Sequence, residues 1–187
     1  MKPLVLLIAP PVYDFALFDL FLKPFGLLTL GRAFEKSGYD IHFINGLDYT
    51  ERESINILGR PRRHANGTGK FFRQVITKPE ILGSLKRNYA RYGICRSVLE
   101  KGIAAQKPDL VLISTGMTYW YPGVIEVVDL VRKYHPEALV IAGGIYATLC
   151  PDHCKKMTGV DYVIRGPAFP EIEGILRAHS LPIPSPE

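Results

Sequence analysis

Few cysteines and no long apolar run limit what this chain can be. Its 187 residues include three cysteines, an odd number without the spacing of a disulfide framework, which is typical of a reducing compartment. The longest apolar runs, such as 4–11, fall well short of the roughly 20 residues that cross a bilayer. Lys2 before a run of strand length does not form a secretory signal. We therefore expect a cytoplasmic protein without a membrane partner.

The motifs of several common enzyme classes are also missing. No GxGxxG follows the first predicted strand, which argues against a dinucleotide-binding domain, and no GxxxxGKS/T phosphate loop occurs. No GxSxG motif is present, and Ser114 has no recognisable His or Asp partner, so hydrolase chemistry has no support. We accordingly assign no catalytic residue and no metal ligand in this chain.

What the chain does contain is a regular alternation of strand and helix patterns. Hydrophobic residues make up 47% of the sequence, enough for one domain with a sizeable core. The predicted strands are 4–9, 39–45, 110–114, 139–142 and 162–165, and the predicted helices are 24–37, 122–134, 151–158 and 170–178. This order predicts an α/β domain over residues 1–180, with a doubly wound, five-stranded parallel sheet between two layers of helices. Residues 181–187 form a proline-rich linker.

A long basic insertion, residues 47–105, interrupts this alternation between the second and third predicted strands. Its part from Arg52 to Arg96 carries 11 Lys or Arg against two Glu, a net of +9, whereas the whole chain carries +5. One interpretation is a clamp for phosphate or nucleic acid, with four aromatic residues as stacking partners: Phe71, Phe72, Tyr89 and Tyr92. We favour a solvated excursion that packs on an acidic neighbour and binds no nucleic acid.

Small residues follow the third and fourth predicted strands. The segment Ser114–Thr118 reads STGMT, and Gly143–Thr148 reads GGIYAT. In an open parallel sheet, ligands lie across the carboxyl ends of the strands, and turns without bulky side chains let the backbone approach them. These segments predict a binding edge for a large flat or phosphorylated ligand. Trp120 could stack on such a ligand, while Glu126 and Asp129 are expected to face solvent.

Six short segments spread over most of the chain carry a family resemblance: 9–14 (APPVYD), 23–28 (KPFGLL), 91–93 (RYG), 117–123 (MTYWYPG), 143–148 (GGIYAT) and 162–166 (YVIRG). Together they resemble the cobalamin-binding domain that precedes the catalytic barrel of many radical S-adenosylmethionine (radical SAM) enzymes. Their order and strand context make the set more specific than any single segment. The resemblance implies a flavodoxin-like, Rossmann-like three-layer sandwich.

The resemblance also implies where a corrinoid would bind. The ring would lie on the carboxyl ends of the strands, with its nucleotide tail threaded into the sheet. The implied cofactor-binding residues are Pro11, Tyr13, Ser114, Thr115, Gly116, Met117, Thr118, Gly143, Gly144, Tyr146, Arg165 and Gly166. The hydroxyls would serve the benzimidazole and its ribose phosphate, which need hydrogen bonds in an otherwise apolar slot. Gly143 and Gly144 would let the tail pass, and Tyr13, Tyr146, Arg165 and Gly166 would border the ring.

Two departures from related families concern metals. Cobalamin-dependent mutases and methionine synthase carry DxHxxG after the first strand, where the histidine binds cobalt. Here the loop 14–19 reads DFALFD, and His42 falls in the second strand, so cobalamin would have no protein histidine ligand. Cys150, Cys154 and Met157 follow the CxxxCxxC spacing with methionine in third place, and two thiolates cannot hold an iron–sulfur cluster. Adding His153 still leaves a zinc site one ligand short, so we expect no redox or metal role here.

The resemblance therefore implies a cobalamin-binding accessory domain of a radical SAM enzyme, methyltransferase-like, with no turnover by this chain alone. The 4Fe-4S cluster and SAM would belong to a C-terminal barrel reached through 181–187, and this barrel and the corrinoid are the expected partners. Two alternatives stay open. One is a degenerate docking module that no longer binds cobalamin, and the other is a flavin- or nucleotide-binding protein of flavodoxin type.

Overall fold

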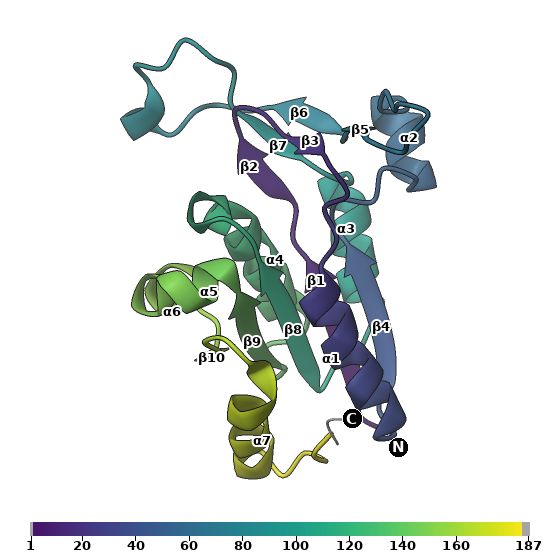
Figure 1. The fold of residues 1–187 in the computed structure, drawn as a ribbon, viewed down its shortest axis with the longest axis vertical. Helices are drawn as coiled ribbons and strands as arrows, with labels where there is room; N and C mark the ends of the chain where they lie inside the picture. Colours follow the sequence, from purple (N-terminus) through teal and green to yellow (C-terminus); the bar gives the residue numbers. More distant parts are fainter. Residues whose placement is uncertain (1, 185–187) are drawn as a thin grey trace.

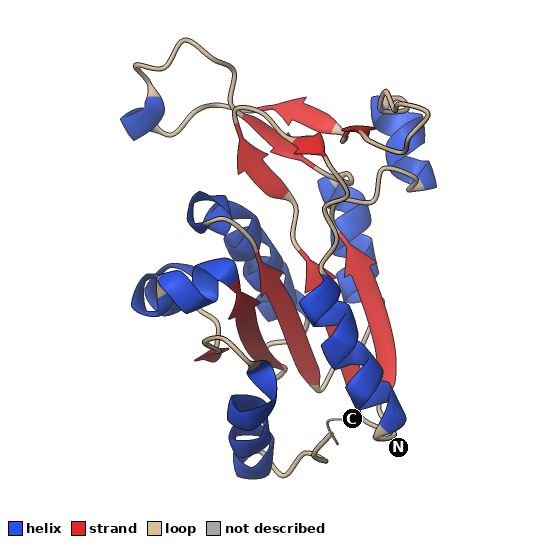
Figure 2. Ribbon diagram, viewed as in Figure 1, coloured by secondary structure: helices blue, strands red, loops and turns tan. Residues whose placement is uncertain are grey.

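The computed structural model describes residues 2–184 and has three layers, with helices on both sides of a sheet (Figures 1 and 2). Within this range the main sheet has five strands in the order β10-β9-β8-β1-β4, and all neighbours are parallel. The strands are β1 (Leu4–Ala9), β4 (Asp40–Asn45), β8 (Leu110–Thr115), β9 (Leu139–Gly144) and β10 (Tyr162–Val163). The predicted doubly wound, five-stranded parallel sheet is confirmed.

Helices cover both faces of the sheet because its strands are apolar on both sides. Successive side chains of a strand point to opposite faces. Leu6 and Ile8 accordingly belong to one core cluster, and Val5 and Leu7 belong to the other. On the Val5 face lie α1 (Phe25–Lys36) and α7 (Ala168–Ala178). On the Leu6 face lie α3 (Arg96–Ala104), α4 (Tyr121–Tyr134), α5 (Ile145–Leu149) and α6 (Pro151–Thr158).

Strands β8 and β9 continue further than their apolar patterns predicted. Ser114 pairs with Gly143 and Thr115 with Gly144, so three residues expected beyond the strand ends, Thr115, Gly143 and Gly144, belong to the ladder. Polar residues and glycine extend a strand readily when a neighbouring backbone satisfies their hydrogen bonds. The short helix η2 (Thr118–Trp120) then leads into α4.

The connection between β4 and β8 folds into small sheets instead of one irregular excursion. It contains α2 (Arg52–Leu58), β5 (Gly69–Lys70), β6 (Arg73–Val75), η1 (Glu80–Leu82), β7 (Ala90–Tyr92) and, last, the crossover helix α3. Strand β7 pairs antiparallel with β6 and with β2 (Val12–Asp14), and β5 pairs with β3 (Phe18–Asp19). We call residues 12–19 and 46–95 the upper module, which extends beyond the carboxyl edge of the main sheet in Figure 1.

Part of the predicted linker lies on the domain. Leu181 packs beside the core cluster of α1 and α7, and the Tyr39 hydroxyl donates a hydrogen bond to the Pro182 carbonyl oxygen at 2.5 Å. Residues 185–187, the remainder of that predicted linker, lie outside the described residues. Between residues 2 and 184, no helix combines the length and the apolar character needed to span a membrane.

Candidate functional site

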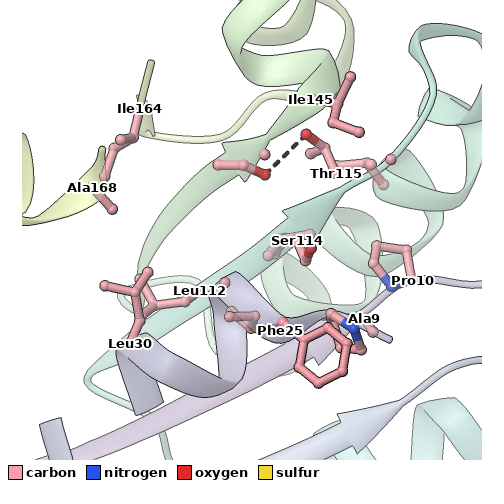
Figure 3. A pocket seen from close by; sticks show the side chains of 18 of the residues that line it. Ala9, Pro10, Phe25, Leu30, Leu112, Ser114, Thr115, Ile145, Ile164 and Ala168 are labelled. Atoms are coloured by element: carbon pink, nitrogen blue, oxygen red, sulfur yellow. Dashed lines mark hydrogen bonds between the residues drawn. The ribbon is translucent and has the colours of Figure 1, made fainter. Parts of the chain in front are cut away.

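A cavity of about 620 Å³ opens at the carboxyl ends of the central strands. It lies between the ends of β1, β8 and β9 and the first turns of α1 and α7 (Figure 3). Its walls are mostly apolar and include Phe25, Leu112 and Ile164. Small-molecule pockets commonly measure about 300–1,000 Å³, and in open α/β sheets they occur at this edge. The cavity therefore has the size and position of a ligand site.

Most of the predicted site residues line this cavity: Pro11, Ser114, Thr115, Gly116, Gly143, Gly144 and Gly166. They come from four separate segments of the chain. The structure brings them together because the carboxyl ends of parallel strands meet at one edge of the sheet. The edge predicted from sequence and the cavity coincide.

The two adjacent glycines of β9, Gly143 and Gly144, differ in the space around their Cα atoms. A Cβ atom on Gly143 would meet only the Ile164 Cβ, at 4.0 Å, so the missing side chain leaves open space. A Cβ atom on Gly144 would lie 2.4 Å from the Thr115 carbonyl oxygen, and its φ of +110° disfavours any other residue. Gly143 therefore opens the cavity, whereas Gly144 lets β8 and β9 approach closely.

The two hydroxyls at the end of β8 are also distinct. The Thr115 hydroxyl donates to the Gly143 carbonyl oxygen at 2.9 Å (Figure 3). It also accepts from the Ala147 N–H at 3.1 Å. It therefore fastens β9 and α5 to the sheet edge. The Ser114 hydroxyl has no hydrogen-bond partner anywhere in residues 2–184 and lines the cavity. Of these two hydroxyls, that of Ser114 is the one available to a ligand.

Trp120 forms part of the wall beside Gly116. Its Nε1–H donates to the Asp14 carboxylate at 2.9 Å, and a Cβ atom on Gly116 would lie 2.7 Å from its ring. The ring is thus held from two sides. It is also the single tryptophan of the sequence, so tryptophan fluorescence reports on this wall of the cavity.

The other predicted site residues, Tyr13, Met117, Thr118, Tyr146 and Arg165, do not line the cavity. Met117 is 46% exposed and precedes η2, which Thr118 begins. Arg165 is exposed, and its backbone N–H donates to the Glu171 carboxylate at 3.3 Å.

Tyr146 is buried in α5, away from the expected ring border. It is 1% exposed, and its hydroxyl lies 2.7 Å from His153 Nδ1. Burial raises the pKa of this phenol well above its ordinary value. The ring of Tyr121 packs against both Tyr146 and His153. Helical periodicity turns Tyr146 toward the core because α5 starts directly after β9.

The histidines and cysteines singled out in the sequence do not form a metal-binding cluster among the described residues. In the part of the chain that the structure describes, no group of three or more His, Cys, Asp or Glu side chains could hold a metal ion. Cys150 caps the start of α6, and Cys154 is buried within it, where burial raises the pKa of its thiol. His42 lies in β4 opposite Leu6 and is not a wall residue.

A buried ion pair joins the upper module to the main domain. Arg91 of β7 and Glu126 of α4 lie 2.8 Å apart, with side chains only 5% and 4% exposed. The Tyr13 hydroxyl donates to the same carboxylate at 3.0 Å. Burial, followed by the charge of Glu126, raises the pKa of Tyr13 to about 12. The expectation that Glu126 faces solvent was wrong, because β2 and β7 cover that face of α4.

The aromatic residues of the basic stretch are not available for stacking. Phe71, Phe72, Tyr89 and Tyr92 are each at most 6% exposed. Among residues 2–184, the carboxylates paired with cations of 52–96 are Asp19, with Arg63, and Glu126, with Arg91 and Arg96. The other cations of the stretch lack a carboxylate partner within the described chain, so its packing on acidic neighbours is limited to these two carboxylates.

Sequence reasoning missed the contribution of two helix starts to the cavity. The wall includes Lys23, Pro24 and Phe25 before and in α1, and Ala168 and Phe169 in α7. The segment 23–28 had been singled out only as part of the resemblance. Periodicity places a helix but does not say over which strand ends its first turn lies, so only the packing reveals these residues.

The structure is an α/β domain of flavodoxin-like type with a cavity at the carboxyl edge of its sheet. The protein-family model described as "B12 binding domain" matches residues 93–175. No curated protein matches the chain.

One similar solved structure is the 1.5 Å crystal structure of a novel cobalamin-binding protein from Desulfitobacterium hafniense DCB-2. The TM-score is 0.51 at 12% sequence identity, and the match covers 96% of this chain and 58% of that chain. At this identity the likeness shows the fold. The present chain thus spans little more than half the length of that protein.

Proposed function

We propose that this chain is the cobalamin-binding module of a radical SAM enzyme. The observation that carries the proposal is the open cavity at the carboxyl edge, where the small residues of β8 and β9 leave room for the tail of a ligand. The match of residues 93–175 to the B12 binding domain supports this class of ligand. The likeness of fold to a structure described as a cobalamin-binding protein agrees with it.

The wall of the cavity fits the nucleotide tail of cobalamin. Its benzimidazole is flat and apolar, and it would lie against aliphatic residues such as Leu112 and Ile164. A polar atom of the tail needs a hydrogen bond once it leaves water. Ser114 offers that bond because the Thr115 hydroxyl already has two backbone partners. On this proposal Ser114 binds the tail and Thr115 keeps the edge in shape.

On this proposal the chain would offer no histidine to cobalt, since the loop 14–19 contains none and the described wall residues include none. Bound cobalamin supplies a metal centre that carries a methyl group between donor and acceptor. The chain itself would hold the tail, orient the ring over the sheet edge and exclude water from its lower face.

The reaction itself we assign to a further domain. On this proposal that domain is a radical SAM barrel holding a 4Fe-4S cluster and SAM, and the present chain alone shows no turnover. Methyl transfer to an unactivated carbon is the reaction class that this pairing favours.

The test is a titration of the purified chain with cobalamin, followed by its visible spectrum and by Trp120 fluorescence. We expect quenching, because a corrin at this edge would lie near the Trp120 wall, and a spectrum without a nitrogen ligand below cobalt. Gly143→Leu should abolish binding while the chain stays folded, because its side chain enters open space in the cavity.

Gly174→Leu is the matched control, since Gly174 is exposed on α7 and lies outside the cavity wall. It should bind cobalamin as the wild type does. An unchanged spectrum and unchanged fluorescence would favour the docking module that has lost cobalamin. Quenching by flavin and not by cobalamin would favour the flavodoxin-type alternative.

A further inference from the structure

The cavity wall is almost free of charge. Lys23 is the single charged side chain among the described residues that line it. All other wall residues are apolar, glycine or neutral polar. Lys23 is exposed and directly precedes Pro24 and the first turn of α1, so it lies where the cavity meets solvent.

The Lys23 ammonium group interacts electrostatically with Asp19 but is bonded to no side chain of the described residues. Within residues 2–184 it forms no ion pair and no hydrogen bond. Asp19, four residues earlier, already pairs with Arg63 at 2.7 Å and accepts the Leu22 N–H at 2.9 Å. An unpaired cation at the mouth of an apolar cavity favours a ligand with an apolar part and an anionic part.

The start of α1 adds to this preference. No side chain caps the helix, and its first turn contains no acidic residue. The positive end of the helix dipole therefore lies beside Lys23 without a neutralising group.

We propose that Lys23 recognises the phosphodiester of the nucleotide tail of cobalamin. This inference rests on the proposed function. The phosphodiester joins the base to the ring and is the anionic group of that tail. When the base occupies the apolar interior, the phosphodiester stays toward the mouth, where Lys23 is the cation of the wall. Lysine pairs with phosphate as a flexible point charge, so no fork-like geometry is required.

The experiment compares cobalamin with cobinamide, which keeps the ring but lacks the phosphodiester, ribose and base. Dissociation constants are measured by Trp120 quenching for the wild type, Lys23→Gln, Lys23→Arg and Lys86→Gln. The last variant removes the same charge from the exposed β6–β7 connection, outside the cavity wall. We expect Lys23→Gln to weaken cobalamin binding about tenfold, the size of one charge-assisted contact, and to leave cobinamide binding unchanged.

Further variants and added salt show whether the charge of Lys23, and not the shape of its side chain, determines the affinity for cobalamin. Lys23→Arg should retain most of the affinity for cobalamin, and Lys86→Gln should retain all of it. Added salt should weaken cobalamin binding by the wild type more than by Lys23→Gln, because screening acts on the ion pair.

An equal loss for both corrinoids in Lys23→Gln would overturn the inference, since Lys23 would then act on the ring or on the fold. No loss for either would also overturn it and would leave the proposed function intact. A wild type that binds neither corrinoid would overturn the proposed function and this inference together.

Discussion

The carboxyl edge of the main sheet and the upper module differ in how polar and apolar contacts stabilise them. The edge ends strands of six residues whose side chains fill two large apolar cores. The upper module has strands of two or three residues around a small apolar cluster, and the buried pair of Arg91 and Glu126 joins it to α4. At the edge, absent side chains leave the cavity open. At the contact between the module and α4, a buried polar pair adds to the apolar packing.

Close backbone contact completes the junction between the two regions. Gly93 has a φ of +126°, and a Cβ atom there would lie 2.1 Å from the Gly46 carbonyl oxygen. The next N–H, that of Ile94, donates to the same oxygen at 2.9 Å. An added Cβ atom is therefore not tolerated at Gly144 of the edge or at Gly93 of this junction, whereas at the pair of Arg91 and Glu126 the loss of a polar group destabilises the fold. Three predictions test this difference.

The largest effect is expected for Glu126→Ala. It leaves the buried Arg91 guanidinium without its carboxylate, and removing one partner of a buried pair costs about 3–5 kcal/mol. The free energy of unfolding at neutral pH, from urea titration, measures the loss. Glu173→Ala is the matched control, because its pair with Arg177 is exposed and worth about 0.5 kcal/mol or less. Equal losses in the two variants would contradict the view that the buried pair holds the module.

The next effect distinguishes the adjacent glycines of the edge. Gly144→Ala should destabilise the fold by about 2–3 kcal/mol, because its φ of +110° and its 2.4 Å approach to the Thr115 oxygen leave no place for Cβ. Gly143→Ala should cost less than about 1 kcal/mol, since its Cβ enters open space. Thermal unfolding of both variants gives the comparison. A loss at Gly143 as large as at Gly144 would show that the cavity is narrower than described here.

The difference between Gly143 and Gly144 also decides which substitution can block the predicted ligand slot. From the sequence we expect Gly144→Trp to close the slot without unfolding the domain. In the structure that substitution would strain the ladder between β8 and β9, so a loss of binding would not identify the slot. Gly143 is the position for such a variant.

The smallest effect concerns Tyr13 and alkaline pH. Its folded-state pKa of about 12 is raised from 10.0, so the folded protein favours the neutral phenol. This contribution is fully present below pH 10 and is lost as pH rises from about 10 through about 12. Tyr13→Phe should cost about 1 kcal/mol at neutral pH, where it removes one hydrogen bond to Glu126. Unfolding free energies between pH 8 and roughly pH 11 should therefore converge for wild type and variant. A difference that stays constant with pH would contradict the assigned role of Tyr13.

Sequence patterns predicted the main sheet well and the upper module poorly. Runs such as Leu4–Ala9 are apolar on both faces, and this pattern arises when a parallel strand is covered by helices on both sides. The short strands β2, β6 and β7 mix polar and apolar residues, and their pairing joins Tyr13 to Arg91, far apart in the chain. No local pattern specifies such a partner.

In the candidate site, too, some residues can be recognised in the sequence and others only in the structure. Ser114 and the glycines were found because small residues at strand ends are visible in the sequence. Tyr146 was misplaced, because the sequence did not reveal that α5 begins directly after β9 and turns this side chain inward. Lys23 was not distinguished as a wall residue, because its place depends on how α1 lies against the sheet.

The sequence by itself determined the order of strands and helices, the parallel sheet and the edge at which small residues gather, because these follow from the local alternation of apolar, polar and glycine residues. The tertiary structure alone decided which hydroxyl stays free, which glycine opens space and which charge faces the cavity. Those properties depend on distances between segments far apart in the chain, and a pattern along the chain does not contain such distances.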